Sequence, residues 1–254
     1  MTTTAAPRRP MLRTLVVTEA RLLLREPILL VWTTGLPIIA FTVLALVPGT
    51  SRPTDTLGGL SYAQVYLGII ALIALALLST MSLPAVLGAY RERGVLRRLS
   101  VTPMRPWRLL ATQIGINLTV VLSTVAVMLI VATATFDDGF PGHPLGWLVT
   151  YLLAATALLG LAALVAAVAP SAKIANAITS ILFFPLMFFA GLWMPQQQMP
   201  GWLRTISEYT PLGAASQALT ASIEGDFPPI TALAVLAAYA AVFVGLAIRT
   251  FRWE

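Results

Sequence analysis

Six long apolar segments dominate this sequence and decide what kind of fold it can adopt. An α-helix rises about 1.5 Å per residue, so roughly 20 apolar residues cross a hydrocarbon core of about 30 Å. Hydrophobic residues make up 58% of the 254-residue chain and charged residues only 10%, a composition typical of integral membrane proteins. The segments long enough to span a membrane are 28–47, 63–88, 109–135, 145–168, 174–194 and 229–248.

These segments are predicted to be helices and not strands of a barrel. A transmembrane strand shows about ten residues that alternate between lipid-facing and lumen-facing side chains. Stretches such as ALIALALL and LLAATALLGLAALVAAVA are instead apolar on every side. The sequence therefore predicts an all-α integral membrane protein, in which residues 1–254 form a single transmembrane domain of six helices with a flexible N-terminus at 1–10.

Basic residues are divided unevenly between the two sides of the membrane that these spans define. Five arginines precede the first span, six lie in the loop 91–108, two follow the last span, and Lys173 joins them on the same side. Only Arg52 and Arg204 fall on the other side. The positive-inside rule makes the richer side cytoplasmic. We expect a multi-pass protein of the cell (inner or plasma) membrane with both termini cytoplasmic, whose basic charge records topology and not binding of nucleic acid.

Residues 11–26 are predicted to form an amphipathic helix in the membrane surface. Two threonines, Arg21 and Arg25 make one polar stripe, and leucines and a valine occupy the opposite face. Glu19 and Glu26 fall on the apolar face, where carboxylates are unfavourable unless they are paired. They either reach water at the edge of the helix or pair with arginines of the loop between the second and third spans.

That loop, RERGVLRRLSVTPMRPWR (91–108), contains six arginines. Placing six arginines at the bilayer centre would cost roughly 15 to 20 kcal/mol on insertion scales, so the loop must lie at or beyond the cytoplasmic interface. Val95, Leu96 and Leu99 lie among the arginines, which is unlike a plain solvated tail. A lid, a lipid anchor and a docking surface all fit this pattern.

The segment 195–228, on the outer side, is too long for a simple connection. Pro200 suits the first turn of a short helix, in which Arg204 and Glu208 would form an i, i+4 pair. GAASQAL is small and apolar enough for a second short helix. We expect two short helices that re-enter the outer leaflet, and the alternative is a loop that lies on the surface with a tryptophan as anchor.

Motifs of catalysis are missing from the chain. There is no G-x-x-x-x-G-K-[ST], H-E-x-x-H or G-x-S-x-G, and no cysteine. The single histidine, His143, has no second metal ligand near it and is predicted to be a loop residue. We therefore expect no enzyme activity and no cofactor in this chain.

No Asp, Glu, Lys or Arg lies within the six predicted spans. Ion-coupled transporters usually keep a titratable residue there. A transporter without such a residue needs an external motor, and the loop 91–108 is the large cytoplasmic surface on which a motor could act. Gln113 and Asn117, one helical turn apart, are expected to form hydrogen bonds between helices.

The order of these features resembles the membrane (permease) subunit of type-2 ABC exporters of the drug- and antibiotic-resistance kind. The resemblance is carried by RERGVLRRLSVTPMRPWRLL, by FFPLMFFAGLWMPQQQMPGWLRTISEYTPLGAASQAL and by the terminal RTFRWE. It implies a homodimer, or a pair with a paralogous permease, above two separate ABC ATP-binding subunits that hold ATP and Mg²⁺. It also implies that 11–26 is a connecting helix, represented by Glu19, Arg21, Arg25 and Glu26. A coupling helix would dock into the ATP-binding subunit through Arg91, Glu92, Arg93, Gly94, Val95, Leu96, Arg97, Arg98 and Leu99.

In the family that the sequence resembles, the second and fifth spans line the transport pathway. By position these are residues 63–88 and 174–194. Within them, the side chains that could meet an amphiphile are Ser79, Thr80, Ser82, Asn176, Thr179, Phe183, Phe184 and Phe188.

The sequence favours an ATP-driven exporter subunit for a lipophilic or amphipathic compound, with membrane lipids as its surroundings. The nearest alternative keeps the family and changes the cargo to a lipid-linked glycan or polymer. A further alternative is a membrane scaffold that transports nothing.

Overall fold

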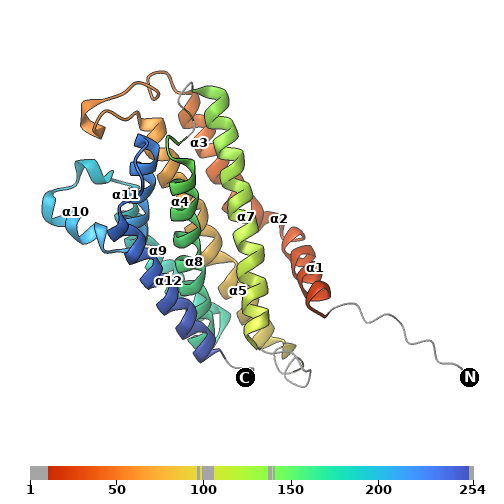
Figure 1. The fold of residues 1–254 in the computed structure, drawn as a ribbon. Helices are drawn as coiled ribbons and strands as arrows, with labels where there is room; N and C mark the ends of the chain where they lie inside the picture. The colour runs from red at the N-terminus through yellow and green to blue at the C-terminus, as the bar shows by residue number, and fades with distance from the viewer. Residues whose placement is uncertain (1–10, 96–97, 99–105, 137–138, 140, 252–254) are drawn as a thin grey trace, which may run out of the picture.

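The computed structural model describes residues 11–95, 98, 106–136, 139 and 141–251, and the regular elements within them are helices (Figure 1). Six of these are long and apolar enough to cross a membrane, as the sequence predicts. They are α2 to α3 (Pro27–Leu46), α4 to α5 (Tyr62–Glu92), α7 (Pro106–Thr135), α8 (Pro144–Val168), α9 (Ala172–Ala190) and α12 (Ile230–Thr250). The remaining elements are α1 (Met11–Leu24), η2 (Asp55–Leu57), η3 (Gln196–Gln198), α10 (Gly201–Glu208) and α11 (Pro211–Glu224).

Two of the spans are interrupted where proline removes a backbone donor. The first consists of α2 (Pro27–Leu30), a wide π-turn η1 (Val31–Gly35) and α3 (Leu36–Leu46). The second consists of α4 (Tyr62–Met81) and α5 (Leu83–Glu92). Pro84 has no N–H, so the carbonyl four residues earlier, that of Thr80, lacks its partner in the helix. The hydroxyl of Thr179, on α9, lies 3.2 Å from this carbonyl and can donate to it.

Polar side chains begin several of the helices. Ser61 forms a reciprocal capping box with Gln64 at the start of α4, and Ser171 and Thr210 accept from backbone N–H groups at the starts of α9 and α11. His143 caps α8, because its Nδ1 accepts from the N–H of Gly146 at 3.0 Å. The histidine therefore has a structural contact at a helix end.

The centre of the bundle is formed by α4 and α8. About two thirds (67%) of the most apolar stretch of each is buried, against 17 to 28% in the other four spans. Tyr151 of α8 is fully buried, stacks on Trp147 and donates to the carbonyl of Ala71 at 3.1 Å. Small residues allow close approach of α8 and α12: a Cβ added at Gly160 would lie 2.8 Å from a methyl group of Val244.

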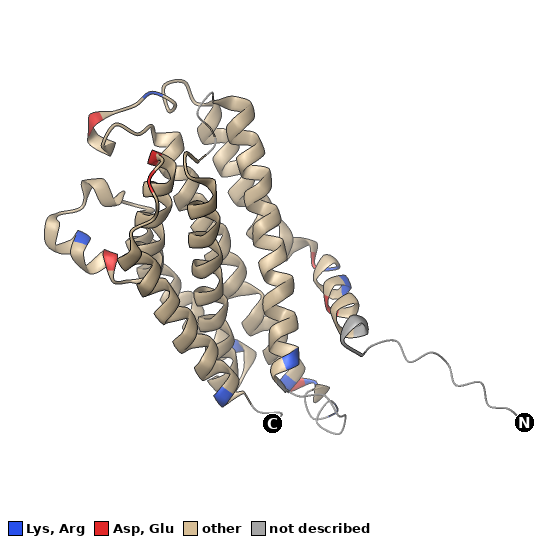
Figure 2. Ribbon diagram, in the orientation of Figure 1, with Lys and Arg blue, Asp and Glu red and all other residues tan. Residues whose placement is uncertain are grey.

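Basic residues are distributed unevenly between the two ends of the bundle. Figure 2 shows Lys and Arg gathered mainly at the lower end and on α1, whereas acidic residues lie on the connections at the upper end and also on α1, at the lower end and on the outer segment. The lower end is where α5 and α12 finish and α9 begins. This arrangement agrees with the uneven division of basic residues along the sequence.

The fifth span is shorter than expected. Gly191 adopts a left-handed conformation (φ +96°) and ends α9 at Ala190, before the predicted boundary at 194. The chain then forms η3 and α10, which lies beside the bundle between its two ends (Figure 1). From there α11 runs to the start of α8, where the N–H of His143 donates to the carbonyl of Ser222 at 2.8 Å.

Candidate coupling surface and transport site

The last turn of α5 is attached to the connection between α8 and α9. Arg91 donates from its guanidinium to the carbonyls of Ala169 and Ala167, the second at 3.2 Å. Glu92 accepts from the N–H of Ala172 at 3.2 Å. A cation at the C-terminal end of α8 and a carboxylate at the N-terminal end of α9 both match the helix dipoles. We call Arg91 and Glu92, with these three partners, the α5 clamp.

Close backbone packing supports the α5 clamp. A Cβ added to Gly88 would lie 2.4 Å from the Cβ of Ala172, so α5 and the start of α9 touch where only glycine fits. The sequence suggested Glu92 as a contact for a partner subunit, and this stays a prediction; within the chain its exposed carboxylate accepts from the N–H of Ala172. The end of α5 is therefore in direct contact with the ends of two spans.

The chain turns sharply after the α5 clamp. Gly94 has φ +67°, which favours glycine, and the N–H of Arg98 donates to its carbonyl at 3.2 Å. Arg93 and Arg98 are exposed and Val95 is half-buried. Leu96, Arg97 and Leu99, also expected in the coupling helix, lie outside the described residues.

Glu19 has an environment that neither sequence alternative described. It is buried on the side of α1 that faces α7, and its Oε2 accepts from the hydroxyl of Tyr90 at 2.7 Å and from Nε2 of Gln113 at 2.6 Å. Both donors are neutral. Glu26 is exposed, in agreement with the first alternative, and Arg21 and Arg25 are exposed as well.

The polar side chains expected to line a pathway on the second span are mostly turned inward. Ser79 is buried and donates to the carbonyl of Ala76 at 3.1 Å. Thr80 donates to the same carbonyl at 2.7 Å and is half-buried. Ser82 is buried beside the kink, and its hydroxyl has no hydrogen-bond partner among the described residues. These side chains sit at the break between α4 and α5.

The candidates on α9 fall into two groups. Thr179 is buried and faces the kink, and Phe183 packs against the core. Asn176 and Phe184 are exposed, and Phe188 is half-buried against Phe189.

Asn176 and Phe184 belong to an exposed face of α9 that also includes Ser180, and the three residues are spaced at i, i+4 and i+8. Phe184 is 62% exposed. Polar side chains on a membrane-spanning helix usually face protein or a water-filled space, not lipid. This mixed face, the α9 face, is suited to contact with an amphipathic molecule or a second chain.

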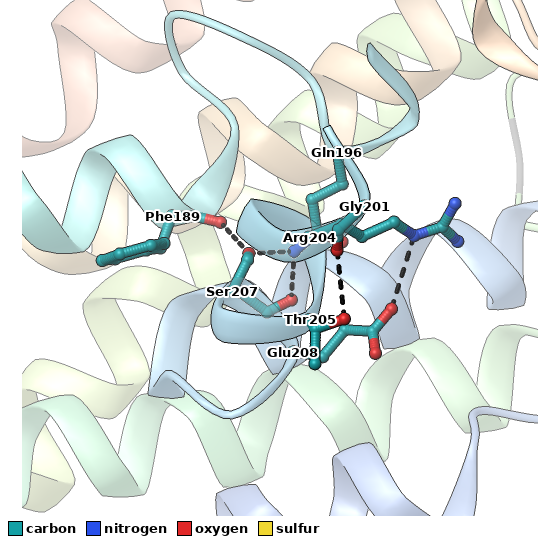
Figure 3. A network of polar contacts seen from close by, with 8 residues as sticks. Phe189, Gln196, Gly201, Arg204, Thr205, Ser207 and Glu208 are labelled. Atoms are coloured by element: carbon teal, nitrogen blue, oxygen red, sulfur yellow. Dashed lines mark hydrogen bonds and ion pairs between the residues drawn. The ribbon is translucent and has the colours of Figure 1, made fainter. Parts of the chain in front are cut away.

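The outer segment is held by a buried polar network (Figure 3). Nε2 of Gln196 donates to Oγ of Ser207 at 2.6 Å and to the carbonyl of Gly213 at 2.9 Å. Ser207 donates in turn to the carbonyl of Phe189 at 3.0 Å. The network joins the end of α9 to η3, α10 and α11. The expected ion pair of Arg204 with Glu208 is present at 3.4 Å.

Some of these polar contacts were expected from the sequence and others were not. Gln113 bonds between helices as expected, whereas the amide nitrogen of Asn117 donates within its own helix, to the carbonyl of Gln113 at 2.8 Å. The α5 clamp and the Gln196 network were not anticipated. A signal for the network exists in the sequence, because a glutamine in an apolar outer segment needs partners when it is buried.

Within the described residues, no group of three or more His, Cys, Asp or Glu could hold a metal ion. What the arrangement provides is contact surfaces and a mechanical connection between them.

Two comparisons with known proteins bear on this arrangement. A family model described as ABC-2 type transporter matches residues 11–223, from α1 almost to the end of α11. The chain is also 24% identical, over 197 residues, to the daunorubicin resistance ABC transporter permease protein DrrB1 of Streptomyces coeruleorubidus. That alignment covers 75% of this chain and 69% of the relative.

Proposed function

Because the chain belongs to the ABC-2 type transporter family, and is thus a membrane transport subunit, we propose that it exports a lipophilic or amphipathic compound, using ATP hydrolysed by a separate subunit. The relative is named for resistance to daunorubicin, which supports a drug- or antibiotic-like cargo. ATP and Mg²⁺ would be bound by the ATP-binding subunit, and this chain contributes the membrane pathway.

The observation that carries the cargo class is the α9 face. Asn176 and Ser180 are exposed on a span of which only 17% of the most apolar stretch is buried. Exposed amide and hydroxyl groups are unfavourable against lipid, and aromatic Phe184 completes the same face. A second copy of the chain that packs with its α9 face opposite would enclose a space with both polar and aromatic walls. Such a space suits an amphipathic compound.

The coupling proposal rests on the α5 clamp. An ATP-binding subunit that docks on the segment after Glu92 would act on the exposed Arg93 and Arg98 and on Val95. The clamp joins that segment to the ends of α8 and α9, so a displacement at the docking surface is passed to the span that carries the α9 face. The positive-inside rule favours the cytoplasm for this end of the bundle.

Re-entry of the outer segment is part of the same proposal. Trp202 and Ile206 are exposed on α10, which lies beside the bundle between its ends. Exposed apolar side chains at that level suit the outer leaflet, and the buried Gln196 network satisfies the polar groups behind them.

The experiment is to purify the full chain from native membranes, to identify by mass spectrometry any ATP-binding protein that accompanies it, and to reconstitute the pair in liposomes. We expect ATP-dependent transport of an amphipathic fluorescent dye, and its loss when the P-loop lysine of the partner is changed. Transport of a lipid-linked glycan in place of the dye would support the alternative cargo. If no ATP-binding protein accompanies the chain and none restores transport, the proposal is wrong.

A further inference from the structure

A cavity of about 300 Å³ lies between α1, α5 and α7, away from the α9 face. Small-molecule sites are typically about 300 to 1,000 Å³ and combine apolar walls with a few polar groups. This cavity has that composition. Leucines of α1 and the small side chains of α5 form its apolar part, and its polar part consists of Glu19, Glu26, Tyr90, Arg93 and Gln113.

Glu19 is the buried charge of this cavity. Its side chain is only 7% exposed, and both of its hydrogen bonds, from Tyr90 and Gln113, end on Oε2. Its other oxygen, Oε1, receives no hydrogen bond from the described residues, and no described cation forms an ion pair with it. A buried carboxylate without a paired cation is unfavourable. Arg93 lines the same cavity but forms no ion pair with Glu19, so this carboxylate can accept a positive charge from a ligand.

The two donors hold this carboxylate in place. Gln113 is 4% exposed, and its side-chain amide reaches the carboxylate from α7. Tyr90 reaches the carboxylate from the last turn of α5. Groups on three helices thus fix Glu19 before any ligand arrives, which lowers the ordering cost of binding.

The charges that face the cavity from its three walls leave an excess of negative charge. α1 contributes Glu19, the start of α2 contributes Glu26, the C-cap of α5 contributes Arg93, α5 itself contributes the hydroxyl of Tyr90, and α7 contributes the neutral amide of Gln113. One guanidinium therefore faces two carboxyl groups. This excess lies at the end of the bundle where Lys and Arg otherwise predominate (Figure 2).

We propose that this cavity binds the ammonium group of an amphipathic cation at the membrane surface. Glu19 balances the ammonium charge, and Leu22, Leu23 and Val86 contact the apolar part of the molecule. The inference rests on the proposed function and deepens it. It narrows the exported compounds to amphipathic cations, which the chain would bind from the inner leaflet. The ammonium group comes either from a transported compound or from the head group of an aminophospholipid.

The test measures binding by the full chain in nanodiscs of phosphatidylcholine, without ATP or an ATP-binding subunit. The probes are a dansyl-labelled primary alkylamine and its N-acetylated form, which differ in charge and share the same apolar part. We expect saturable binding of the amine at least about tenfold tighter than that of the acetylated probe. Because no transport is measured, failure of the cavity proposal and failure of the export proposal give separate results.

Two variants assign the binding to this cavity. Glu19→Gln keeps the shape and an acceptor for Tyr90, and should reduce the preference for the amine to less than about threefold. Ala85→Leu fills the cavity and should weaken the binding of both probes. Glu224→Gln, on α11 at the opposite end of the bundle, is the matched control and should bind like the unchanged chain.

A third arm identifies the source of the ammonium group. If phosphatidylethanolamine in the nanodisc displaces the amine, the cavity holds a lipid head group; if it does not, the cavity selects compounds of the transported kind. Both results support an ammonium site. Equal binding of the two probes, or an unchanged preference in Glu19→Gln, would overturn the proposal.

Discussion

At the scale of single residues, the hydroxyl of Ser207 has a defined role in the outer segment. It is fully buried and joins Gln196 to the carbonyl of Phe189. Ser207→Ala leaves that carbonyl without a donor and should reduce the free energy of unfolding by about 1 to 3 kcal/mol. The measurement is thermal unfolding of the purified chain in detergent.

Thr205→Ala, on the same short helix, is the matched control. Its hydroxyl is exposed and donates only within the helix, to the carbonyl of Gly201 at 3.0 Å, so the change should stay within about 0.5 kcal/mol. Equal effects of the two substitutions would show that the buried network contributes nothing to stability.

Thr179 was expected to contact cargo, and the structure gives it a second role. Its hydroxyl can donate to the carbonyl of Thr80 that Pro84 leaves without a partner. Thr179→Val should destabilise the chain by about 0.5 to 1.5 kcal/mol, the range of hydrogen bonds between membrane helices, and Thr179→Ser should restore stability.

The control for this change is Thr156→Val, because Thr156 donates within α8 to the carbonyl of Leu152 at 2.8 Å. Thermal unfolding is compared for the unchanged chain, Thr179→Val, Thr179→Ser and Thr156→Val. This comparison separates the two roles of Thr179. If Thr179→Val is as stable as Thr179→Ser but transports a different cargo, Thr179 contacts cargo and does not support the kink.

The distance between two residues along the chain explains which site contacts were predictable. Arg204 and Glu208 meet because they are four residues apart on one helix, and spacing alone gives that pair. Arg91 and Ala169 meet across a long stretch of sequence, and only the packing of α5 against α8 and α9 brings them together. Glu19 looked misplaced on an apolar face because its partners, Tyr90 and Gln113, are on other helices.

At the scale of elements, α1 has apolar side chains that are buried in the bundle and others that face outward. Leu23 is buried, with 9% of its surface exposed, and the next residue, Leu24, is 70% exposed. Leu23→Asp would place a charge in the contact between α1 and α7, near Glu19. Leu24→Asp changes only the outward face.

We therefore expect Leu23→Asp to detach α1 while the spans stay inserted, and Leu24→Asp to do so much less. Detachment exposes the backbone after Arg21 and Arg25, so tryptic cleavage there should be at least about tenfold faster in Leu23→Asp. Similar cleavage rates in both variants would mean that α1 is not held by its buried face.

The six spans were predictable from length and composition because a bilayer imposes both, and the structure has six such helices. Interruptions within a span were not predicted. The break at Ser82 depends on how α9 satisfies the carbonyl that Pro84 frees, and the π-turn at Val31–Gly35 is a local change of winding within an apolar span. The early end of α9 depends on the left-handed conformation of Gly191, which a window of hydropathy does not register.

At the scale of the whole molecule, the charge asymmetry predicts an orientation that can be tested directly. The chain has no cysteine, so a single introduced thiol reports only its own position. Thr56→Cys and Lys173→Cys replace exposed residues on opposite ends of the bundle. A membrane-impermeant maleimide should label Thr56→Cys in intact cells and Lys173→Cys only after permeabilisation. The reverse pattern would place the α5 clamp outside the cell and exclude coupling through it.

Substitutions in the α5 clamp should show whether docking of the ATP-binding subunit and transmission of its movement depend on different residues. Arg91 donates to two carbonyls at the end of α8, and lysine cannot reproduce this planar fork. Glu92→Ala removes the contact with the start of α9. Both changes affect contacts within the chain and leave the exposed Arg93 and Arg98 in place. Arg98→Glu is the opposite case, because it changes the exposed segment and not the clamp.

We therefore expect Arg91→Lys and Glu92→Ala to bind the ATP-binding subunit within about threefold of the unchanged chain, and the complex to keep hydrolysing ATP, while transport falls at least about tenfold. Arg98→Glu should instead weaken the complex, by about 2 kcal/mol or roughly thirtyfold if it is an interface hot spot. Pull-down, ATPase and liposome transport assays on equal amounts of folded protein distinguish these outcomes. If Arg91→Lys and Glu92→Ala release the ATP-binding subunit as Arg98→Glu does, both residues belong to the docking surface. Unchanged transport in both would show that movement reaches α9 by another route.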